Sequence, residues 1–280
     1  MRFVKPKVFL IAKTCVIHST VIEWLQHLGC SSLMIDRLSN YVVNSKTDAE
    51  RLIELTGRRC YMSFEPGMNP NVQKIREDIK VYIENILASG HGSVLEHVTF
   101  TFAIEGVSRV FTGEMNRHRA GVAISEGSMR YIRYDDIPIV DVPSIQEVLK
   151  DSIAYSNVDD KRGESRALIE SCVKYVESFY KDLVNTWKDV LDGREFKGKK
   201  HITSMLRRII PMGVATGGVW TMNVRALRHI CALRTSEAAE EEIAIVAGMI
   251  LEIMMKEEPV LFGDFAKDEK GYWKPKYEKV

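Results

Sequence analysis

The strongest constraint on the fold is a helix pattern that is followed closely by a strand pattern. Apolar residues from Val72 to Leu87 fall three or four positions apart, as on one face of an α-helix, and Gly90 ends this stretch. From His97 to Ile104, apolar residues alternate with smaller or polar ones, which is the period of a half-buried β-strand. Helices and sheets of this kind bury their apolar sides against each other. The chain is therefore predicted to have an α+β fold.

Similar patterns elsewhere predict further elements. Val8 to Ala12 is rich in β-branched and aromatic residues and predicts a strand. Helices are expected after Asn223 and over residues 20–28, 168–191, 201–210 and 236–257. The stretch 140–166 has weak periodicity and predicts an exposed loop. Because internal repeats are absent, we expect a single domain in which long helices pack on a mixed or antiparallel sheet.

The charge balance and the cysteines narrow the possible partners. The 280 residues include 39 Lys and Arg and 38 Asp and Glu, so the chain has no overall field that would attract nucleic acid or a membrane surface. Its apolar runs are well short of the roughly 20 residues that cross a bilayer. The five cysteines are scattered without a Cys-x-x-Cys pair, which indicates neither a disulfide framework nor a thiolate zinc site. We expect a cytoplasmic protein that binds no nucleic acid and no membrane.

Cationic and small residues are concentrated between Arg117 and Tyr131, where the sequence reads RHRAGVAISEGSMRY. Small residues let a backbone approach a ligand closely, and guanidinium groups match the geometry of phosphates. The segment favours an anion-binding site. A solvated basic loop that is paired with Glu114 and Glu126 explains the composition equally well.

A second cationic cluster lies on a later, mostly apolar helix. Asn223 suits the N-cap of this helix, and Arg225 and His229 share one face, whereas Arg234 is expected to point nearly the opposite way. Arginines on an apolar helix need anionic partners. Phosphates would supply them, and the alternative is an ion-pair network with the acidic run 237–242. The arginines of this helix are Arg225, Arg228 and Arg234, and Arg207 and Arg208 of the cluster precede Pro211, before the helix.

Two histidines and a carboxylate occur in the segment HGSVLEH, from His91 to His97. The two histidines are six residues apart across a helix-to-strand junction, a spacing that matches no standard metal-ligand pattern. We expect no metal site here.

Taken in order, these motifs resemble the flavin-dependent thymidylate synthases. The resemblance runs from about Cys60 to Ile250, and the Arg-His-Arg block with its downstream Arg-Tyr pair is highly specific to that family. It implies that dUMP is methylated to dTMP, with methylenetetrahydrofolate as carbon donor, NADPH as reductant and FAD as hydride carrier. It also implies a homotetramer with active sites at subunit interfaces. We accordingly expect an N-terminal αβ extension over residues 1–58 and a synthase-like domain over 59–280.

The resemblance also implies roles for individual residues. Arg234 would be catalytic, lying along the base edge of the nucleotide and stabilising negative charge there, with Ser128 positioning the nucleotide. His91 would lie near the folate or nicotinamide. The FAD contacts would be Ser63, Ser93, Arg117, His118, Arg119, Glu126, Asn223, Arg225 and His229. The nucleotide contacts would be Glu114, Gly127, Ser128, Arg130, Arg207 and Arg234.

Several positions depart from the family pattern. The segment from Ala120 to Gly127 is one residue longer than usual, Ser125 replaces an asparagine, and Glu114 and Glu240 replace glutamines. A carboxylate near a phosphate is repulsive unless it is paired, so Glu114 either bridges to an arginine or marks another substrate such as dCMP. The alternatives are a flavin-dependent hydroxymethylase or methylase of dCMP or dUMP, and a catalytically silent nucleotide-binding module.

Overall fold

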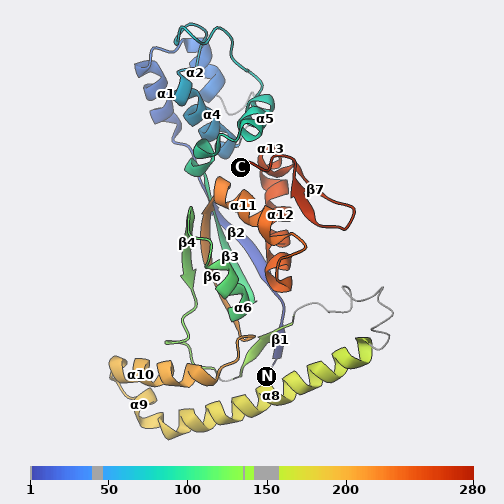
Figure 1. Ribbon diagram of the computed structural model, residues 1–280. Helices are drawn as coiled ribbons and strands as arrows, with labels where there is room; N and C mark the ends of the chain where they lie inside the picture. Colours follow the sequence, from blue (N-terminus) through green and yellow to red (C-terminus); the bar gives the residue numbers. More distant parts are fainter. Residues whose placement is uncertain (1, 40–46, 135, 142–157) are drawn as a thin grey trace. The chain divides into compact units, whose positions relative to one another are not determined.

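The computed structural model describes residues 2–39, 47–134, 136–141 and 158–280 (Figure 1). Helices and strands are both present, which confirms the predicted α+β class. The strands are β1 (Arg2–Val4), β2 (Lys7–Lys13), β3 (Thr99–Ser108), β4 (Val122–Glu126), β5 (Pro138–Val140), β6 (Ala215–Asn223), β7 (Phe265–Lys267) and β8 (Trp273–Pro275). The helices are α1 (His18–His27), α2 (Ser32–Ser39), α4 (Asp48–Tyr61), α5 (Ile79–Ser89), α6 (Arg109–Met115), α8 (Val158–Thr186), α9 (Lys188–Asp192), α10 (Phe196–Leu206), α11 (Val224–Arg234), α12 (Glu241–Glu257) and α13 (Pro259–Phe262), with 3-10 turns η1 (Gly92–His97) and η3 (Arg207–Ile209).

A four-stranded sheet has the order β2-β3-β6-β4. The amide of Gly127 donates to the carbonyl of Gly217, and the amide of Asn223 donates to the carbonyl of Gly121, so β4 and β6 run antiparallel. Strand β6 has no counterpart in the sequence expectations, because Gly217 and Gly218 interrupt its apolar pattern. The antiparallel sheet that the sequence predicts is thus confirmed.

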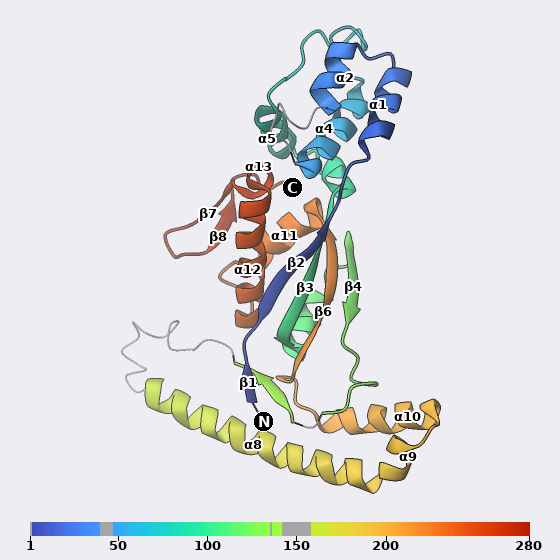
Figure 2. The same cartoon turned by 180° about the vertical axis from the view of Figure 1, so that it is seen from behind.

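The chain divides into two compact units. The first holds residues 1–8, 103–117 and 124–219, and the second holds residues 9–102, 118–123 and 220–280. In the first unit, α8, α9 and α10 follow one another, and α10 contacts both α9 and α8 (Figure 1). In the second unit, α11 contacts α12, η1 and β8. The view from the opposite side also shows the β7–β8 hairpin beside α12 (Figure 2).

Some helix boundaries differ from the sequence expectations. Helix α5 begins at Ile79 rather than near Val72, because the Asp78 carboxylate accepts from the Val81 amide and caps the helix there. Helix α8 begins at Val158, so residues 158–166 of the expected loop are helical, and residues 142–157 lie outside the described residues. Gly90 ends α5 in the left-handed region, as its sequence position predicts.

Helix α4 crosses the expected boundary of the N-terminal extension. It runs from Asp48 to Tyr61 and starts with a capping box, in which Thr47 and Glu50 exchange hydrogen bonds. Helices α1 and α2 contribute Leu25 and Leu38 to an apolar cluster with Leu55 of α4. Residues 1 and 40–46 of this part lie outside the description, and the extension over 1–58 stays a prediction. Within the described part of the chain, no helix combines the length and apolar character that a membrane span requires.

The buried carboxyl of Glu258 makes the stability of the second unit pH-dependent. It accepts a 2.6 Å hydrogen bond from Thr47 Oγ1 and is 1% exposed. Burial raises its pKa to about 7; the negative charges of Glu50 and Glu257 act in the same direction, and Thr47 and Lys13 oppose it. The folded state therefore binds this proton more tightly than the unfolded chain does, so stability falls as pH rises from about 4.3 through 7.

We expect the Glu258→Gln variant to lose this dependence, which is worth on the order of 2 kcal/mol. The measurement is the thermal midpoint of both proteins at pH 5 and pH 8. The native protein should lose more stability between the two values than the variant, and equal losses would show that Glu258 does not titrate there.

Candidate functional site

The start of α11 is tied to the turn that follows the Arg-His-Arg block. Asn223 caps the helix, because its Oδ1 accepts from the Ala226 amide at 2.8 Å. Its own amide donates to the carbonyl of Gly121 at 2.9 Å. A Cβ on Gly121 would lie 2.4 Å from the side-chain Nδ2 of Asn223, and Gly121 also has a φ of +71°. Glycine is therefore required where the two segments meet.

Three distant residues converge beside this junction. Arg234 Nε donates to His118 Nε2 at 2.9 Å, and the rings of His118 and His229 lie edge to face with centroids 6.2 Å apart. An acceptor at Nε2 places the proton of His118 on Nδ1 in the neutral ring. The expectation that Arg234 points away from His229 is wrong, because its long side chain reaches the histidine against which His229 packs.

Arg225 lies over η1. Its Nη1 donates to Glu96 Oε1 at 2.6 Å, and both side chains are about half exposed. A Cβ on Gly92 would lie 2.7 Å from Arg225 Nε, so this glycine lets the guanidinium approach the backbone. Ser93 is exposed on the same 3-10 turn.

The remaining predicted residues of the second unit are less closely connected. The ring of His91 packs edge to face on Tyr61 at 5.7 Å. Ser63 follows α4, and its carbonyl accepts from Arg58 Nη1 at 2.8 Å. Arg119 is exposed.

Arg228 belongs to the framework and not to the ligand site. It is fully buried, and its two terminal nitrogens donate to the two oxygens of Asp264 at 2.7 and 2.9 Å. The expectation that phosphate or the acidic run 237–242 would pair this arginine is therefore wrong. Glu240 of that run instead caps α12 by accepting from the amides of Glu242 and Ile243.

A second group of predicted residues lies in the first unit. Thr203 Oγ1 on α10 donates to the carbonyl of Arg130 at 2.6 Å, so the Arg130 segment is fastened to the helix that ends at Arg207. Arg130 Nε is buried and has no hydrogen-bond partner among the described residues. Ser128 Oγ accepts from the Arg130 amide at 3.4 Å, which is a long contact.

Arg109 and Asn116, which the sequence analysis did not single out, bind the segment that precedes Ser128. The Glu126 carboxylate is paired with Arg109 and accepts from Asn116 Nδ2 at 2.8 Å. Arg109 Nη2 also donates to the carbonyl of Gly127 at 2.5 Å. Burial lowers the pKa of Arg109, and the nearby charge of Arg207 lowers it further, partly offset by Tyr134. Arg109 and Glu126 are 17 residues apart, so no local sequence pattern could have predicted their ion pair.

Glu114 and Arg117 are two further predicted residues of the first unit. Glu114 Oε1 lies 3.7 Å from Arg117 Nη1, and the Arg117 side chain is 73% exposed. Of the two sequence alternatives for Glu114, the structure thus shows the bridge to an arginine. Within this longer segment, Gly121 has a left-handed conformation, and β4 begins directly after it at Val122.

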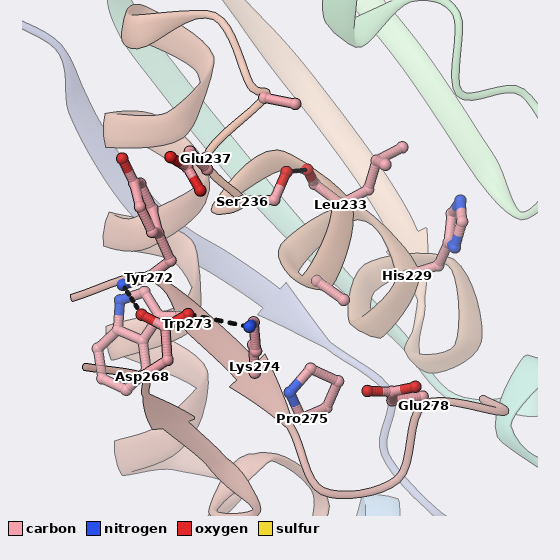
Figure 3. Close-up of a pocket in the computed structure, with 12 residues that line it drawn as sticks. His229, Leu233, Ser236, Glu237, Asp268, Tyr272, Trp273, Lys274, Pro275 and Glu278 are labelled. Carbon is pink, nitrogen blue, oxygen red and sulfur yellow. Dashed lines mark hydrogen bonds and ion pairs between the residues drawn. The ribbon is translucent and has the colours of Figure 1, made fainter. Parts of the chain in front are cut away.

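A few of the predicted residues line cavities. In the first unit, a cavity of about 630 Å³ is lined by residues 125–127, by Glu105 and by residues 215–219 of β6. In the second unit, a cavity of about 510 Å³ is lined by His229 and Leu233 of α11 and by Trp273 and Pro275 of β8 (Figure 3). The structure therefore brings the predicted residues together as two groups, each within its own unit.

Known proteins resemble this chain along most of its length. The family model of the thymidylate synthase complementing proteins matches residues 41–260. The flavin-dependent thymidylate synthase of Corynebacterium diphtheriae is 32% identical over 244 residues, which cover 86% of this chain and 89% of the relative. That of Mycobacteroides abscessus is 32% identical over 262 residues, covering 92% and 89%. These relatives confirm the resemblance that the motifs indicate.

A solved structure supports the fold. The UMP/dUMP methylase PolB from Streptomyces cacaoi, bound with 5-Br dUMP, superimposes with a TM-score of 0.59. The alignment covers 94% of this chain and 96% of that chain at 17% identity. At this identity the likeness concerns the fold alone.

Proposed function

Since the chain belongs to the family of thymidylate synthase complementing proteins, we propose that it is a flavin-dependent thymidylate synthase that methylates dUMP to dTMP. Methylenetetrahydrofolate would donate the carbon, and NADPH would be the reductant. The observation that best supports this function is the meeting of the Arg-His-Arg block with α11, where His118 contacts both Arg234 and His229. The Arg-His-Arg block and α11 carry the proposed flavin and nucleotide contacts. These two motifs must lie together if flavin and nucleotide are to react in one site.

The second unit has the donor set that FAD needs. Exposed Arg119 and half-exposed Arg225 can bind the diphosphate, and the glycines at positions 92 and 121 let backbone and side chains approach closely. Asn223, His229, Ser63, Ser93 and His118 complete the proposed contacts in this unit. The family resemblance also proposes Arg117 and Glu126, which belong to the first unit, as FAD contacts. When bound, FAD supplies a hydride to the pyrimidine ring. The protein's part is to hold the ring, and the polar edges of His118 and His229 can contribute to this.

The first unit has the donor set that a nucleoside monophosphate needs. Arg130 and Arg207 lie on either side of the Thr203 contact and can pair with the phosphate, while Ser128 and Gly127 position the nucleotide. The carboxylate of Glu126 is already bound by Arg109 and Asn116, so Glu126 would act on the flavin indirectly, through the residues that surround it.

Arg234 supplies the electrostatic part of the chemistry. We place its guanidinium along the base edge, where it stabilises negative charge on the pyrimidine as C6 accepts hydride. Its Nε donates to His118 Nε2 at 2.9 Å, and this hydrogen bond helps to fix the guanidinium. A fixed cation of this kind costs no reorganisation during the reaction.

The assembly is proposed from the family resemblance. A homotetramer with active sites between subunits would let each site draw on several chains, with His91 near the folate or nicotinamide. The nucleotide would be the main partner of the protein, and FAD would be its resident cofactor.

The experiment that tests this function compares dUMP with dCMP. Because Glu114 is bridged to Arg117, it is not free to select an exocyclic amine, and we expect dTMP from dUMP and no methylated product from dCMP. The readout is product mass after turnover with methylenetetrahydrofolate and NADPH, which also separates a methyl from a hydroxymethyl product.

The Glu114→Gln variant is the matched control, since it removes the charge and keeps the shape. It should retain the preference for dUMP. Turnover of dCMP by the native protein would show that Glu114 reads the base. A colourless protein that takes up no FAD and turns over neither nucleotide would favour the silent binding module.

A further inference from the structure

Helix α10 carries three lysines that the proposed function leaves without a role. Lys197, Lys199 and Lys200 lie within one turn at the start of the helix. None of them forms an ion pair with another residue in the described part of the chain. Like charges this close on a helix repel one another, so an anionic ligand would relieve a cost that the protein alone does not offset.

An exposed aromatic pair lies at the same place. The rings of Tyr131 and Phe196 are stacked, with centroids 5.8 Å apart and an interplanar angle of 12°. They are 52% and 64% exposed, respectively. Lys200 Nζ lies 5.6 Å from the centroid of the Tyr131 ring. Two exposed, stacked rings with a cation over one of them suit an aromatic ligand with an acidic substituent.

The spacing along α10 connects this surface with the proposed nucleotide site. Phe196, Lys200, Thr203 and Arg207 recur at intervals of four, three and four residues, which places them in one stripe. Thr203 donates to the carbonyl of Arg130, so the stripe faces the Arg130–Tyr131 segment. At about 1.5 Å per residue, the stripe extends roughly 16 Å from Phe196 to Arg207. Lys197 lies about 100° around the helix from Phe196, off the stripe.

We propose that Lys200, with the Tyr131–Phe196 pair, binds the aminobenzoyl-glutamate tail of the folate carbon donor. The stacked rings would take the benzoyl ring, and the ammonium group would take a carboxylate of the tail. The nucleotide cannot occupy this surface with its own ring, because its base must lie at the flavin. This inference rests on the proposed function, which supplies the folate.

The test uses the flavin-loaded protein, with Lys200→Gln as the variant and Lys197→Gln as the matched control. Both changes remove one positive charge from the same turn. We expect Lys200→Gln to raise the KM for methylenetetrahydrofolate about fivefold, with the KM for dUMP within about twofold of native, and Lys197→Gln to change neither. Native protein should also bind a folate with additional glutamates more tightly than the monoglutamate, and Lys200→Gln should reduce this preference.

The outcomes separate the possible roles of Lys200. A higher KM for dUMP with an unchanged folate KM would assign Lys200 to the nucleotide phosphate and overturn the proposal, as would equal effects in both variants. Equilibrium binding of methylenetetrahydrofolate gives a readout that does not need turnover. If the native protein forms no dTMP while Lys200→Gln still weakens folate binding, the proposed function fails and the tail site stands.

Discussion

Replacing Arg234 with alanine is expected to lower kcat about a hundredfold or more while the protein keeps its flavin. Removing one fixed donor from a site of developing negative charge has an effect of this size. The flavin should remain bound, because the substitution leaves Arg225, Asn223 and the close contacts at Gly92 and Gly121 unchanged. The measurement is single-turnover dTMP formation, with flavin occupancy read from the absorption spectrum of the same sample.

The control for Arg234 lies two and a half turns earlier on the same helix. Arg225→Ala removes a cation that we assign to the FAD diphosphate, and it should lose flavin first and activity as a consequence, with activity restored by excess FAD. If Arg234→Ala loses its flavin to the same extent, this arginine holds the cofactor through His118 and does not act on the base.

Replacing Asp264 with alanine is expected to destabilise the second unit by about 3–5 kcal/mol. The change leaves the Arg228 guanidinium, which is 0% exposed, without its carboxylate partner. Arg228 would keep its stacking on Phe265, at 5.1 Å, but stacking does not neutralise a buried charge. The expected fall in the thermal midpoint is on the order of 10 °C.

Two further variants test whether the burial of the Arg228 charge causes the loss of stability in Asp264→Ala. Glu237→Ala breaks an ion pair with Lys270 in which both side chains are mostly exposed, and it should leave the midpoint unchanged. Replacing Arg228 and Asp264 together with leucine removes both charges and should be less harmful than Asp264→Ala. An Asp264→Ala protein as stable as Glu237→Ala would show that Arg228 finds another partner.

Local patterns predicted the fold class and the elements that carry the site. The alternation around Phe100 and Phe102 gave β3, and the asparagine at 223 gave the start of α11, because capping and periodicity depend on neighbouring residues only. Strand β6 was missed because Gly217 breaks its pattern, and that glycine is needed where Glu105 lies against the strand, as a Cβ there would overlap the carboxylate.

Pairings between distant segments could not be predicted from the sequence. Nothing local joins Arg228 to Asp264, or Arg109 to Glu126, and the direction of the Arg234 side chain depends on where the turn at His118 lies. The motifs therefore predicted candidate residues of the site, whereas three-dimensional geometry showed which of them make framework contacts. Arg228 and Glu126 are two residues for which such contacts were not predicted.

The most direct test of the central claim is a single turnover without oxygen. The protein is reduced anaerobically and mixed with dUMP and methylenetetrahydrofolate, while flavin absorbance and nucleotide products are followed together. The account expects the flavin to become oxidised and dTMP to form in an equal amount, because the hydride passes from the flavin to the pyrimidine in one shared site. A flavin that stays reduced while the nucleotide remains dUMP would contradict it.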